Sequence, residues 1–442
     1  MNISVIVRKV GYNKNIVIVK EGSMELHIRN IAKIEKADIE INGITVIAGE
    51  NNTGKSTVGK VLYCLYTAFH NLDERAFDER CSSIAVALSD NPELRTEIFS
   101  SLDGKIPEKI WTLIDRILSV SSDELESLLQ QEQVNLEDSA IKRIKNAVGI
   151  SDEDLKRIII GEVFEEEFCE QVKPIGKTKD ISSIEFLIKG KKSALNITEG
   201  YKVQNEMVLS TECIIIDNPF AIDEIFKSKE ESPEILNLFT GLEGKISHDA
   251  FLDNKLCRPL GKSANKDLIG QYYLEERLNK FKDYIIDVVG GNIVEREDKF
   301  VFHDNELGKD LELKNLSAGI KTFTILLKLL ENGDIQDGSM IVLDEPEIHL
   351  HPSWQLKFAE LLVLLQKEFD LNIVLATHSP YFMNALQVYS AKHAIADKTK
   401  YYLAKLNEKG KAVFEDVTLD PERVYKLLAQ PFQILADEEG QE

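Results

Sequence analysis

Residues 49–57 have the side chains and the spacing needed to hold a chain of phosphates. The run GENNTGKST fits the pattern G-x-x-x-x-G-K-[ST], and it lies between the apolar segment ITVIA and a helical pattern of apolar residues. Two glycines let backbone N–H groups wrap phosphates, Lys55 can reach the β and γ oxygens, and the Ser56 hydroxyl can hold Mg²⁺. We therefore expect nucleotide binding by Gly49, Asn51, Asn52, Thr53, Gly54, Lys55, Ser56 and Thr57.

Two carboxylates end a second apolar segment, SMIVLDE at residues 339–345. An apolar strand ending in Asp-Glu is by itself commonly structural, because charged residues are frequent at strand ends. Beside a phosphate loop it is the form that a metal-holding aspartate takes. We expect Asp344 to hold Mg²⁺ through water and Glu345 to activate or orient the attacking water, which makes Mg²⁺ an expected cofactor.

Two further segments could contact a terminal phosphate. Ser317 and Gly319, in NLSAGIK, precede a helical pattern, so they offer a hydroxyl, free N–H groups and the positive end of a helix dipole. Read alone, Ser317 is an ordinary helix N-cap. His378 ends the strand-like NIVLAT and could sense the phosphate, although a single histidine there is usually structural. For His349 and His351, which lack a nearby third ligand, we expect structural roles rather than a metal site.

The pattern of apolar residues predicts an α/β protein. Strand-like segments open the chain, the first of them SVIV and NIVIV on either side of a turn at residues 11–14, and a helix follows Ser56. From residue 71 to about 172 the pattern is helical and acidic, with breaks near Pro92, Gly104 and Gly149. A period of two then predicts a small antiparallel β unit whose hairpin tip is Lys189-Gly190, and a second hairpin is expected around residues 293–303. Beyond residue 314, apolar runs alternate with helices, as a parallel sheet buried on both faces requires.

We divide the chain into four regions on this basis. They are an N-terminal part of the core at 1–70, an inserted helical lobe at 71–175, β-hairpin and helical elements at 176–310, and a C-terminal part of the core at 311–442. The catalytic candidates Lys55, Glu345 and His378 thus come from the two ends of the chain.

Composition and charge limit the classes of partner. The net charge of -22 repels phosphate backbones on average, so nucleic-acid binding is not indicated. The one basic stretch, 173–192, is better explained by lysines at the edge of a hairpin than by a contact with phosphates. If it did contact a phosphate backbone, the contacting residues would be Lys189, Lys191 and Lys192. The chain has no apolar run of membrane-spanning length and no leader-like start, so we expect a cytoplasmic protein without membrane contact. Its five cysteines are widely spaced and indicate neither disulfides nor zinc.

The motifs GENNTGKST, LSAGIK, IVLDEPEIHLHP and ATHSP resemble, in order and style, those of ABC-type ATPases. They look most like the branch that contains SMC-like proteins, the ATPase half of overcoming-lysogenisation-defect (OLD) nucleases, and the PtuA-like ATPases of antiphage systems. The resemblance implies an ABC-type P-loop ATPase head with a mixed sheet, Ser317 and Gly319 as the signature, and His378 as the switch histidine. In this family the signature completes the site of the opposite subunit, so the resemblance also implies a homodimer that sandwiches ATP.

The chain departs from the family pattern in places. Ala318 and Ile320 replace the second glycine and the glutamine of the commonest signature, and no metal-contacting glutamine stands out, so the region of Asp217-Asn218 is the best candidate for that position. The residues after His378 are too few for the TOPRIM nuclease of OLD members. We therefore expect a separate effector protein.

Our preferred hypothesis is that the protein is an ATP-dependent dimer switch in a bacterial antiphage or toxin-type assembly. A non-hydrolysing nucleotide-bound scaffold for a partner protein is the first alternative. An SMC-like DNA-maintenance ATPase is the second, and it should carry long heptad coiled coils, whereas breaks interrupt every helical run of this sequence. A transporter ATPase is disfavoured by the long separation of Ser56 from Ser317.

Overall fold

The computed structural model describes residues 18–19, 22–99, 107–174, 181–225, 247–258, 268–296 and 299–439. The expected strand SVIV, the turn at residues 11–14 and the break at Gly104 lie outside these residues.

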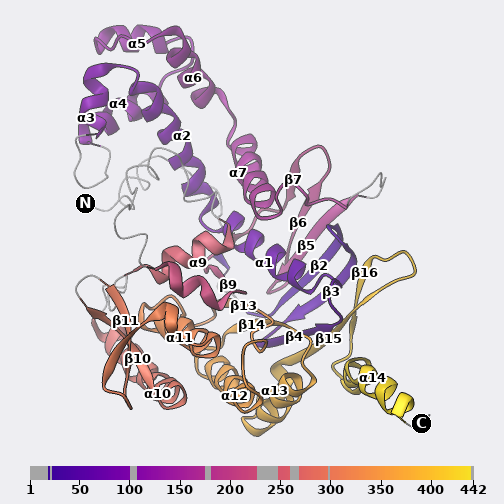
Figure 1. Ribbon diagram of the computed structural model, residues 1–442. Helices are drawn as coiled ribbons and strands as arrows, with labels where there is room; N and C mark the ends of the chain where they lie inside the picture. The colour runs from indigo at the N-terminus through magenta and orange to yellow at the C-terminus, as the bar shows by residue number, and fades with distance from the viewer. Residues whose placement is uncertain are drawn as a thin grey trace.

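One mixed sheet of eleven strands forms the centre of the molecule (Figure 1). Its order is β7-β6-β5-β2-β3-β16-β15-β4-β14-β13-β9. Strands β9, β13, β14, β4 and β15 are mutually parallel, whereas β2, β3, β5, β6 and β7 pair antiparallel. The strand bounds are β2 Met24–Ile31, β3 Ile34–Ile41, β4 Ile44–Gly49, β5 Ser182–Ile188, β6 Lys191–Ile197, β7 Tyr201–Gln204, β9 Cys213–Ile216, β13 Met340–Asp344, β14 Asn372–Thr377, β15 Thr399–Leu406 and β16 Ala412–Asp416.

Alternating side chains of the parallel strands enter two separate cores. Val46 of β4 packs with helices α10 (Leu268–Val289), α11 (Ala318–Glu331), α12 (Pro352–Phe369) and α13 (Pro380–Lys392) on one face. Ile47 of the same strand packs with α1 (Lys55–Phe69) and α7 (Asp152–Glu167) on the other. Because these strands are buried on both faces, their sequences are unbroken runs of apolar residues. The sequence prediction of an α/β fold with a parallel core is thereby confirmed.

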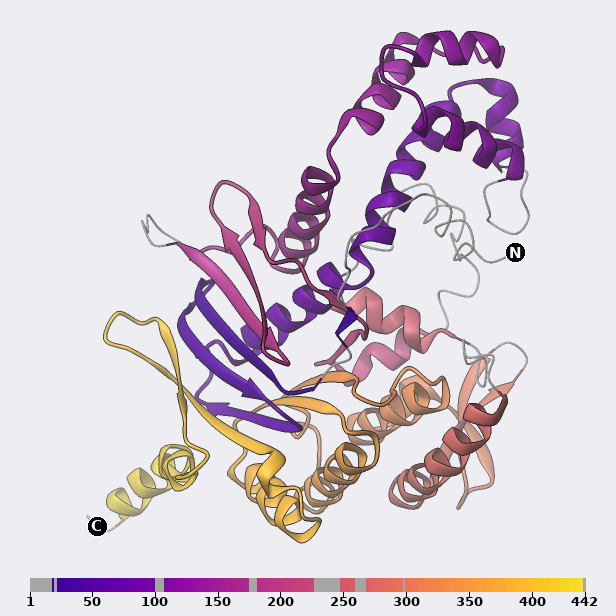
Figure 2. The same cartoon turned by 180° about the vertical axis from the view of Figure 1, so that it is seen from behind.

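A helical lobe projects from the α1 face of the sheet and has its own core (Figures 1 and 2). Helices α2 and α7 connect it to the head, and the shorter helices lie at its far end. The expected breaks appear at Pro92, which begins α3, and at Gly149, which ends α6. No described helix of the lobe exceeds the 17 residues of α2. The lobe helices are α2 Leu72–Leu88, α3 Pro92–Phe99, α4 Glu108–Leu118, α5 Leu125–Gln131, α6 Asp138–Gly149 and α7 Asp152–Glu167.

The predicted β hairpins are both present. Lys189 and Gly190 form the tip between β5 and β6 with positive φ angles of 50° and 74°. This antiparallel unit is not a sheet of its own, because β5 pairs with β2 and so continues the central sheet. The second hairpin, β10 (Gly291–Arg296) and β11 (Lys299–Asp304), adds β12 (Lys309–Glu312) to make a small sheet.

The remaining elements connect these units. They are β1 Ile18–Val19, which pairs with β8 Val208–Leu209, the short 3-10 helices η2 Pro219–Glu224, η4 Leu313–Asn315 and η5 Ala396–Lys398, and the helices α9 His248–Leu256 and α14 Glu422–Glu439. Within the described part of the chain, no helix is both long and apolar enough to cross a bilayer.

Candidate functional site

The loop between β4 and α1 has the backbone shape of a phosphate cradle. Gly49 passes so close to β15 that a Cβ atom there would lie 2.3 Å from the carbonyl oxygen of Ala404. Gly54 caps α1 with a left-handed φ of 79°, and neither a capping side chain nor an acidic residue occupies the first turn of the helix. The N–H groups of this turn and the positive end of the helix dipole therefore face the loop, where an anion can bind.

Lys55 lies inside this loop and is 5% exposed. Its Nζ donates to the carbonyl oxygens of Gly49, at 3.0 Å, and Glu50, at 2.9 Å. Burial lowers the pKa of Lys55, and the negative charge of Glu345 and Asp344 opposes that shift. Thr53 closes the loop by donating its hydroxyl to Glu50 O at 2.7 Å. The neighbouring side chains differ in burial: those of Asn51, Asn52 and Ser56 are exposed, and that of Thr57 is half-buried. The predicted phosphate-binding residues from 49 to 57 therefore lie together in this loop and in the first turn of α1.

Ser56 and Asp344 meet although they are far apart in sequence. Asp344 ends β13, and the Ser56 hydroxyl hydrogen-bonds to its carboxyl. Burial raises the pKa of Asp344, and that hydrogen bond opposes the shift. The Oδ1 of Asp344 is buried without a hydrogen-bond partner among the described residues. A buried unsatisfied carboxylate oxygen beside a hydroxyl fits Mg²⁺, which prefers oxygen ligands and retains several waters. Ser56 and Asp344 would hold that ion.

Glu345 and His378 lie at the ends of adjacent strands. Glu345 has a positive φ of 49°, and its N–H donates to Ala376 O at 2.8 Å, so its side chain turns toward the phosphate loop. Its Oε1 lies 3.2 Å from His378 Nδ1 and 3.8 Å from Lys55 Nζ. The three catalytic candidates thus converge at the carboxyl ends of β4, β13 and β14.

Glu347 is a residue of this site that the sequence interpretation left without a role. It is 2% exposed, its Oε1 accepts a hydrogen bond from the Thr377 hydroxyl, and the N–H of His378 donates to the same atom at 3.3 Å. Burial raises the pKa of Glu347, and the bond from Thr377 opposes the shift. Its position in the run DEPE is visible in the sequence, but its burial is not.

The residues assigned to the signature lie on the other face of the sheet. Ser317 caps α11 by accepting the N–H of Ile320 at 3.5 Å. A Cβ at Gly319 would lie 3.2 Å from the carbonyl oxygen of His349, so this helix end packs against the loop after Glu345. α11 belongs to the core opposite α1, and neither residue lines the pocket beside Lys55 and Ser56.

The two neighbouring histidines have separate structural contacts. His351 caps α12, where its Nδ1 accepts the N–H of Ser353 at 3.3 Å. The ring of His349 meets that of Phe220 edge-on, with centroids 5.8 Å apart. The expectation of structural roles agrees with these contacts.

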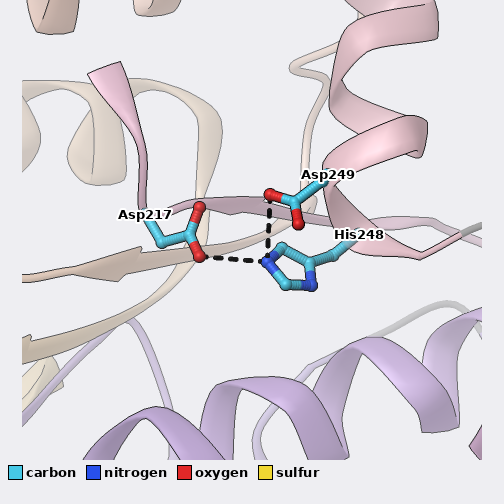
Figure 3. A group of neighbouring side chains, drawn as sticks. All are labelled: Asp217, His248 and Asp249. Atoms are coloured by element: carbon cyan, nitrogen blue, oxygen red, sulfur yellow. Dashed lines mark hydrogen bonds and ion pairs between the residues drawn. The ribbon is translucent and has the colours of Figure 1, made fainter. Parts of the chain in front are cut away.

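A group of charged residues beside the site was not foreseen (Figure 3). Asp217, directly after β9, lies with its Oδ2 3.0 Å from His248 Nε2. The Nδ1 of His248 lies 2.8 Å from Glu167 Oε1. Asp249 Oδ1 is 3.5 Å from the same Nε2. The three elements concerned are distant in sequence, and no motif links their residues. Only the region of Asp217 was singled out, as the candidate for the missing glutamine.

Comparison with known families assigns the chain. A family model described as AAA ATPase domain matches residues 24–383. The chain belongs to the AAA ATPase domain family. Every residue of the site, from Gly49 to His378, lies inside the matched AAA ATPase domain. No curated protein matches the chain.

Solved structures with similarity to this AAA ATPase domain include two SMC heads. The chain is 12% identical to the SMC head domain from Thermotoga maritima, covering 90% of this chain and 99% of that one with a TM-score of 0.40. For the Pyrococcus furiosus Smc head with an extended coiled coil, bound to the C-terminal domain of ScpA, the identity is 12%, the coverage 92% and 99%, and the TM-score 0.42. The chain is also 12% identical to an ATP-binding cassette of an ABC transporter in its ADP conformation. That match covers 92% of this chain and 96% of the other, with a TM-score of 0.34. The family assignment rests on the family model alone.

Proposed function

We propose that this protein binds ATP with Mg²⁺, hydrolyses it, and uses the cycle to close and open a dimer of two copies. One observation supports hydrolysis above all: Lys55, Ser56, Asp344, Glu345 and His378 come together at one edge of the sheet from both ends of the chain. This edge carries the carboxyl ends of parallel strands, where α/β proteins bind their ligands.

Each residue has a distinct task in the proposed reaction. The N–H groups at the start of α1 and the Lys55 ammonium would bind the phosphates, replacing the loop carbonyls that Lys55 contacts here. Mg²⁺, held by Ser56 and Asp344, would neutralise charge on the phosphate oxygens. Glu345 would orient a water molecule and accept its proton. His378, 3.2 Å from Glu345, would keep that carboxylate in place and donate to the terminal phosphate.

The position of the signature supports a dimer. Ser317 and Gly319 carry a helix N-terminus suited to a phosphate, yet α11 lies on the opposite face of the sheet from α1. A second copy, turned by a two-fold axis, could present its α11 end to the first copy's phosphate loop. Two ATP molecules would then be enclosed between the two chains, and their hydrolysis would allow the two chains to separate.

The activity that this switch controls would belong to a separate effector protein. The helical lobe, joined to the head by α2 and α7, is the part best placed to transmit the dimer's opening to an effector. The resemblance of DEPEIHLHP and THSP to the OLD-like branch supports an antiphage or toxin-type setting for that effector.

Two substitutions test the proposal. Glu345→Gln should bind ATP and remain a dimer in ATP and Mg²⁺, because hydrolysis is blocked, while phosphate release should fall by roughly a factor of 100 or more. Lys55→Ala should fail to bind ATP and remain monomeric. Light scattering after size-exclusion chromatography and phosphate release measure the two effects. Equal phosphate release from wild type and Glu345→Gln would contradict hydrolysis at this site, and the non-hydrolysing scaffold would then be the better description if ATP still bound.

A further inference from the structure

We propose that Gln355 is a positioning residue for His378. Its amide joins the loop after β13 to the loop after β14, and it thereby keeps the histidine ring within reach of Glu345. Gln355 lies near the start of α12, outside every motif of the sequence analysis. The inference rests on the proposed function, because the role of His378 is part of the proposed hydrolysis.

The side chain of His378 is not enclosed by packing. It is 42% exposed and follows Thr377, the last residue of β14. Its Nδ1 lies 3.2 Å from Glu345 Oε1, and a small rotation of the backbone at residue 378 would change that distance. The direction of the ring therefore depends on how firmly residues 377–379, which we call the switch segment, are held.

Glu347 holds the first part of the switch segment. Its Oε1 accepts hydrogen bonds from the Thr377 hydroxyl and, at 3.3 Å, from the N–H of His378. The N–H of Ser379 donates to the hydroxyl oxygen of Thr377 at 3.0 Å. These bonds fix the backbone from the side of β14, and they leave the Ser379 hydroxyl to be held from another direction.

Gln355 holds the second part through its side-chain amide. Its Oε1 accepts a hydrogen bond from the Ser379 hydroxyl at 3.2 Å, and the oxygen of that hydroxyl accepts the N–H of Phe382 at 3.2 Å, which caps α13. The Nε2 of Gln355 donates to the carbonyl oxygens of Glu347, at 3.3 Å, and Leu350, at 3.2 Å. One side chain thus contacts the loops after both strands, and His378 lies between its two anchors.

These contacts use the full hydrogen-bonding capacity that distinguishes an amide. A primary amide offers two N–H donors and an acceptor oxygen, and here the donors meet two carbonyls while the oxygen meets a hydroxyl. All three contacts are partly buried, and a buried polar group that loses its partner is costly. An apolar side chain of similar size would fill the same space and release the switch segment on the Ser379 side.

The test compares two glutamines of one helix in the full chain. Gln355→Leu removes the three bonds. Gln366→Leu is the matched control, because Gln366 is also on α12, is 1% exposed, and has no hydrogen-bond partner for its amide among the described residues. Its Nε2 lies 3.2 Å from the place of a Cβ at Gly43, which precedes β4, whereas the phosphate loop follows that strand.

The expected effect is on turnover and not on binding. Gln355→Leu should lower the turnover number for ATP by roughly 10-fold, because a catalytic group that is slightly misplaced loses much of its effect. Gln366→Leu should leave the turnover number unchanged. The dissociation constant for ATP should stay within about a factor of three of the wild-type value in both variants. Phosphate release and equilibrium ATP binding measure the two quantities.

A double-mutant cycle with His378→Ala shows whether the effect passes through the histidine. If Gln355 orients His378, the variant with both changes should turn over at the rate of His378→Ala alone, because no ring is left to orient. A general structural role would lower the rate by the same factor in both backgrounds. Ser379→Ala should lower turnover as Gln355→Leu does, and Ser379→Thr, which retains the hydroxyl, should stay close to wild type.

Amide hydrogen exchange reports on the switch segment without turnover. In a peptide covering residues 377–382, Gln355→Leu should increase deuterium uptake, because local opening becomes easier when the segment loses an anchor. Gln366→Leu should leave the uptake of this peptide as it is in the wild type.

Two results would overturn the inference. One is a folded Gln355→Leu protein that turns over ATP as fast as Gln366→Leu, and the other is a loss of rate that is equal with and without His378→Ala. Should Gln355→Leu fail to fold, equal turnover by Ser379→Ala and wild type would overturn it in the same way. A wild-type protein that releases no phosphate is a different result and contradicts the proposed function itself, and in that case unchanged exchange of residues 377–382 in Gln355→Leu would also refute the anchoring.

Discussion

The Nδ1 of His378 lies 3.2 Å from Oε1 of Glu345. The two residues are at the ends of the adjacent parallel strands β14 and β13, so the contact links the proposed base to the residue that would sense the terminal phosphate. Neither residue is part of the phosphate loop. We therefore expect their contact to affect the proposed hydrolysis step more than the binding of nucleotide.

Replacing His378 tests this separation of binding from hydrolysis. His378→Ala should lower the turnover number by roughly 100-fold, a typical loss when one hydrogen-bond donor to the developing charge is removed. The dissociation constant for ATP should change by less than about a factor of three, because Lys55 and the α1 N-terminus remain. Steady-state phosphate release and equilibrium ATP binding measure the two quantities. A variant that binds ATP far more weakly yet turns over normally at saturation would contradict this assignment.

Glu347 gives a second prediction about the same strand ends. Glu347→Ala leaves the Thr377 hydroxyl and the His378 N–H without their acceptor in a buried place, so it should reduce the free energy of unfolding by about 1–3 kcal/mol and lower turnover. Glu347→Gln retains an acceptor oxygen of the same shape and should stay close to wild type in both respects. Urea unfolding and phosphate release distinguish the variants, and equal losses in both would show that the carboxylate charge is what matters.

Particular residues show what the sequence could predict. Lys55, Ser56, Asp344 and Glu345 lie in short motifs whose neighbours are apolar strands and a helix, so pattern and spacing were enough to bring them to one site. The α/β class followed from apolar runs buried on both faces, such as β4.

Other relationships need three-dimensional information. The pairing of β5 with β2, which joins the small antiparallel unit to the central sheet, depends on strand register across more than 150 residues. The contact of His248 with Glu167 and Asp217 joins three segments that carry no motif. Such long-range contacts between charged residues leave no periodic signal in a single sequence, because each residue alone resembles an ordinary surface side chain.

Gly59 of α1 is predicted to be required for packing rather than for chemistry. A Cβ at this position would lie 2.7 Å from Cγ1 of Val342 on β13, so Gly59→Ala must displace either α1 or the Val342 side chain and should cost about 1–3 kcal/mol of stability. At Gly149, the last residue of α6, the nearest atom to a Cβ is 3.9 Å away. Gly149→Ala is therefore the control, expected to be neutral or to stabilise by up to about 1 kcal/mol. Thermal unfolding of both variants checks the contrast, and a stable Gly59→Ala protein would contradict the packing described.

Lys328 should make stability rise with pH in the alkaline range. It is fully buried, its Nζ donates to Arg258 O at 3.0 Å, and it lies 3.6 Å from the centroid of the Phe300 ring. Burial lowers its pKa to about 8, although nearby acidic groups, Glu331 first among them, oppose the shift. Since the folded pKa is below the unfolded value, the cost of burying the charge is present below pH 8. It is relieved as the pH rises toward 10.5.

Lys328→Met removes this titration. Relative to the variant, the wild type should gain roughly 1–3 kcal/mol in the free energy of unfolding between pH 7.5 and about pH 10. Urea unfolding at several pH values measures the difference between the two proteins, in which the titrations they share cancel. A difference that stays constant over this range, or that moves the other way, would contradict a depressed pKa at Lys328.

The central claim, that each ATP lies between the phosphate loop of one copy and the signature helix of the other, is tested most directly by mixing two inactive variants. Lys55→Ala disables the loop, and Ser317→Arg blocks the N-terminus of α11. If the site is shared, a mixed dimer has one site with an intact loop and an intact signature. Equal amounts should then recover ATPase activity that neither variant shows alone, up to about half of the wild-type rate, since each mixed dimer has one working site of two. No recovery from two folded variants that exchange subunits, or full activity of Ser317→Arg alone, would contradict the account.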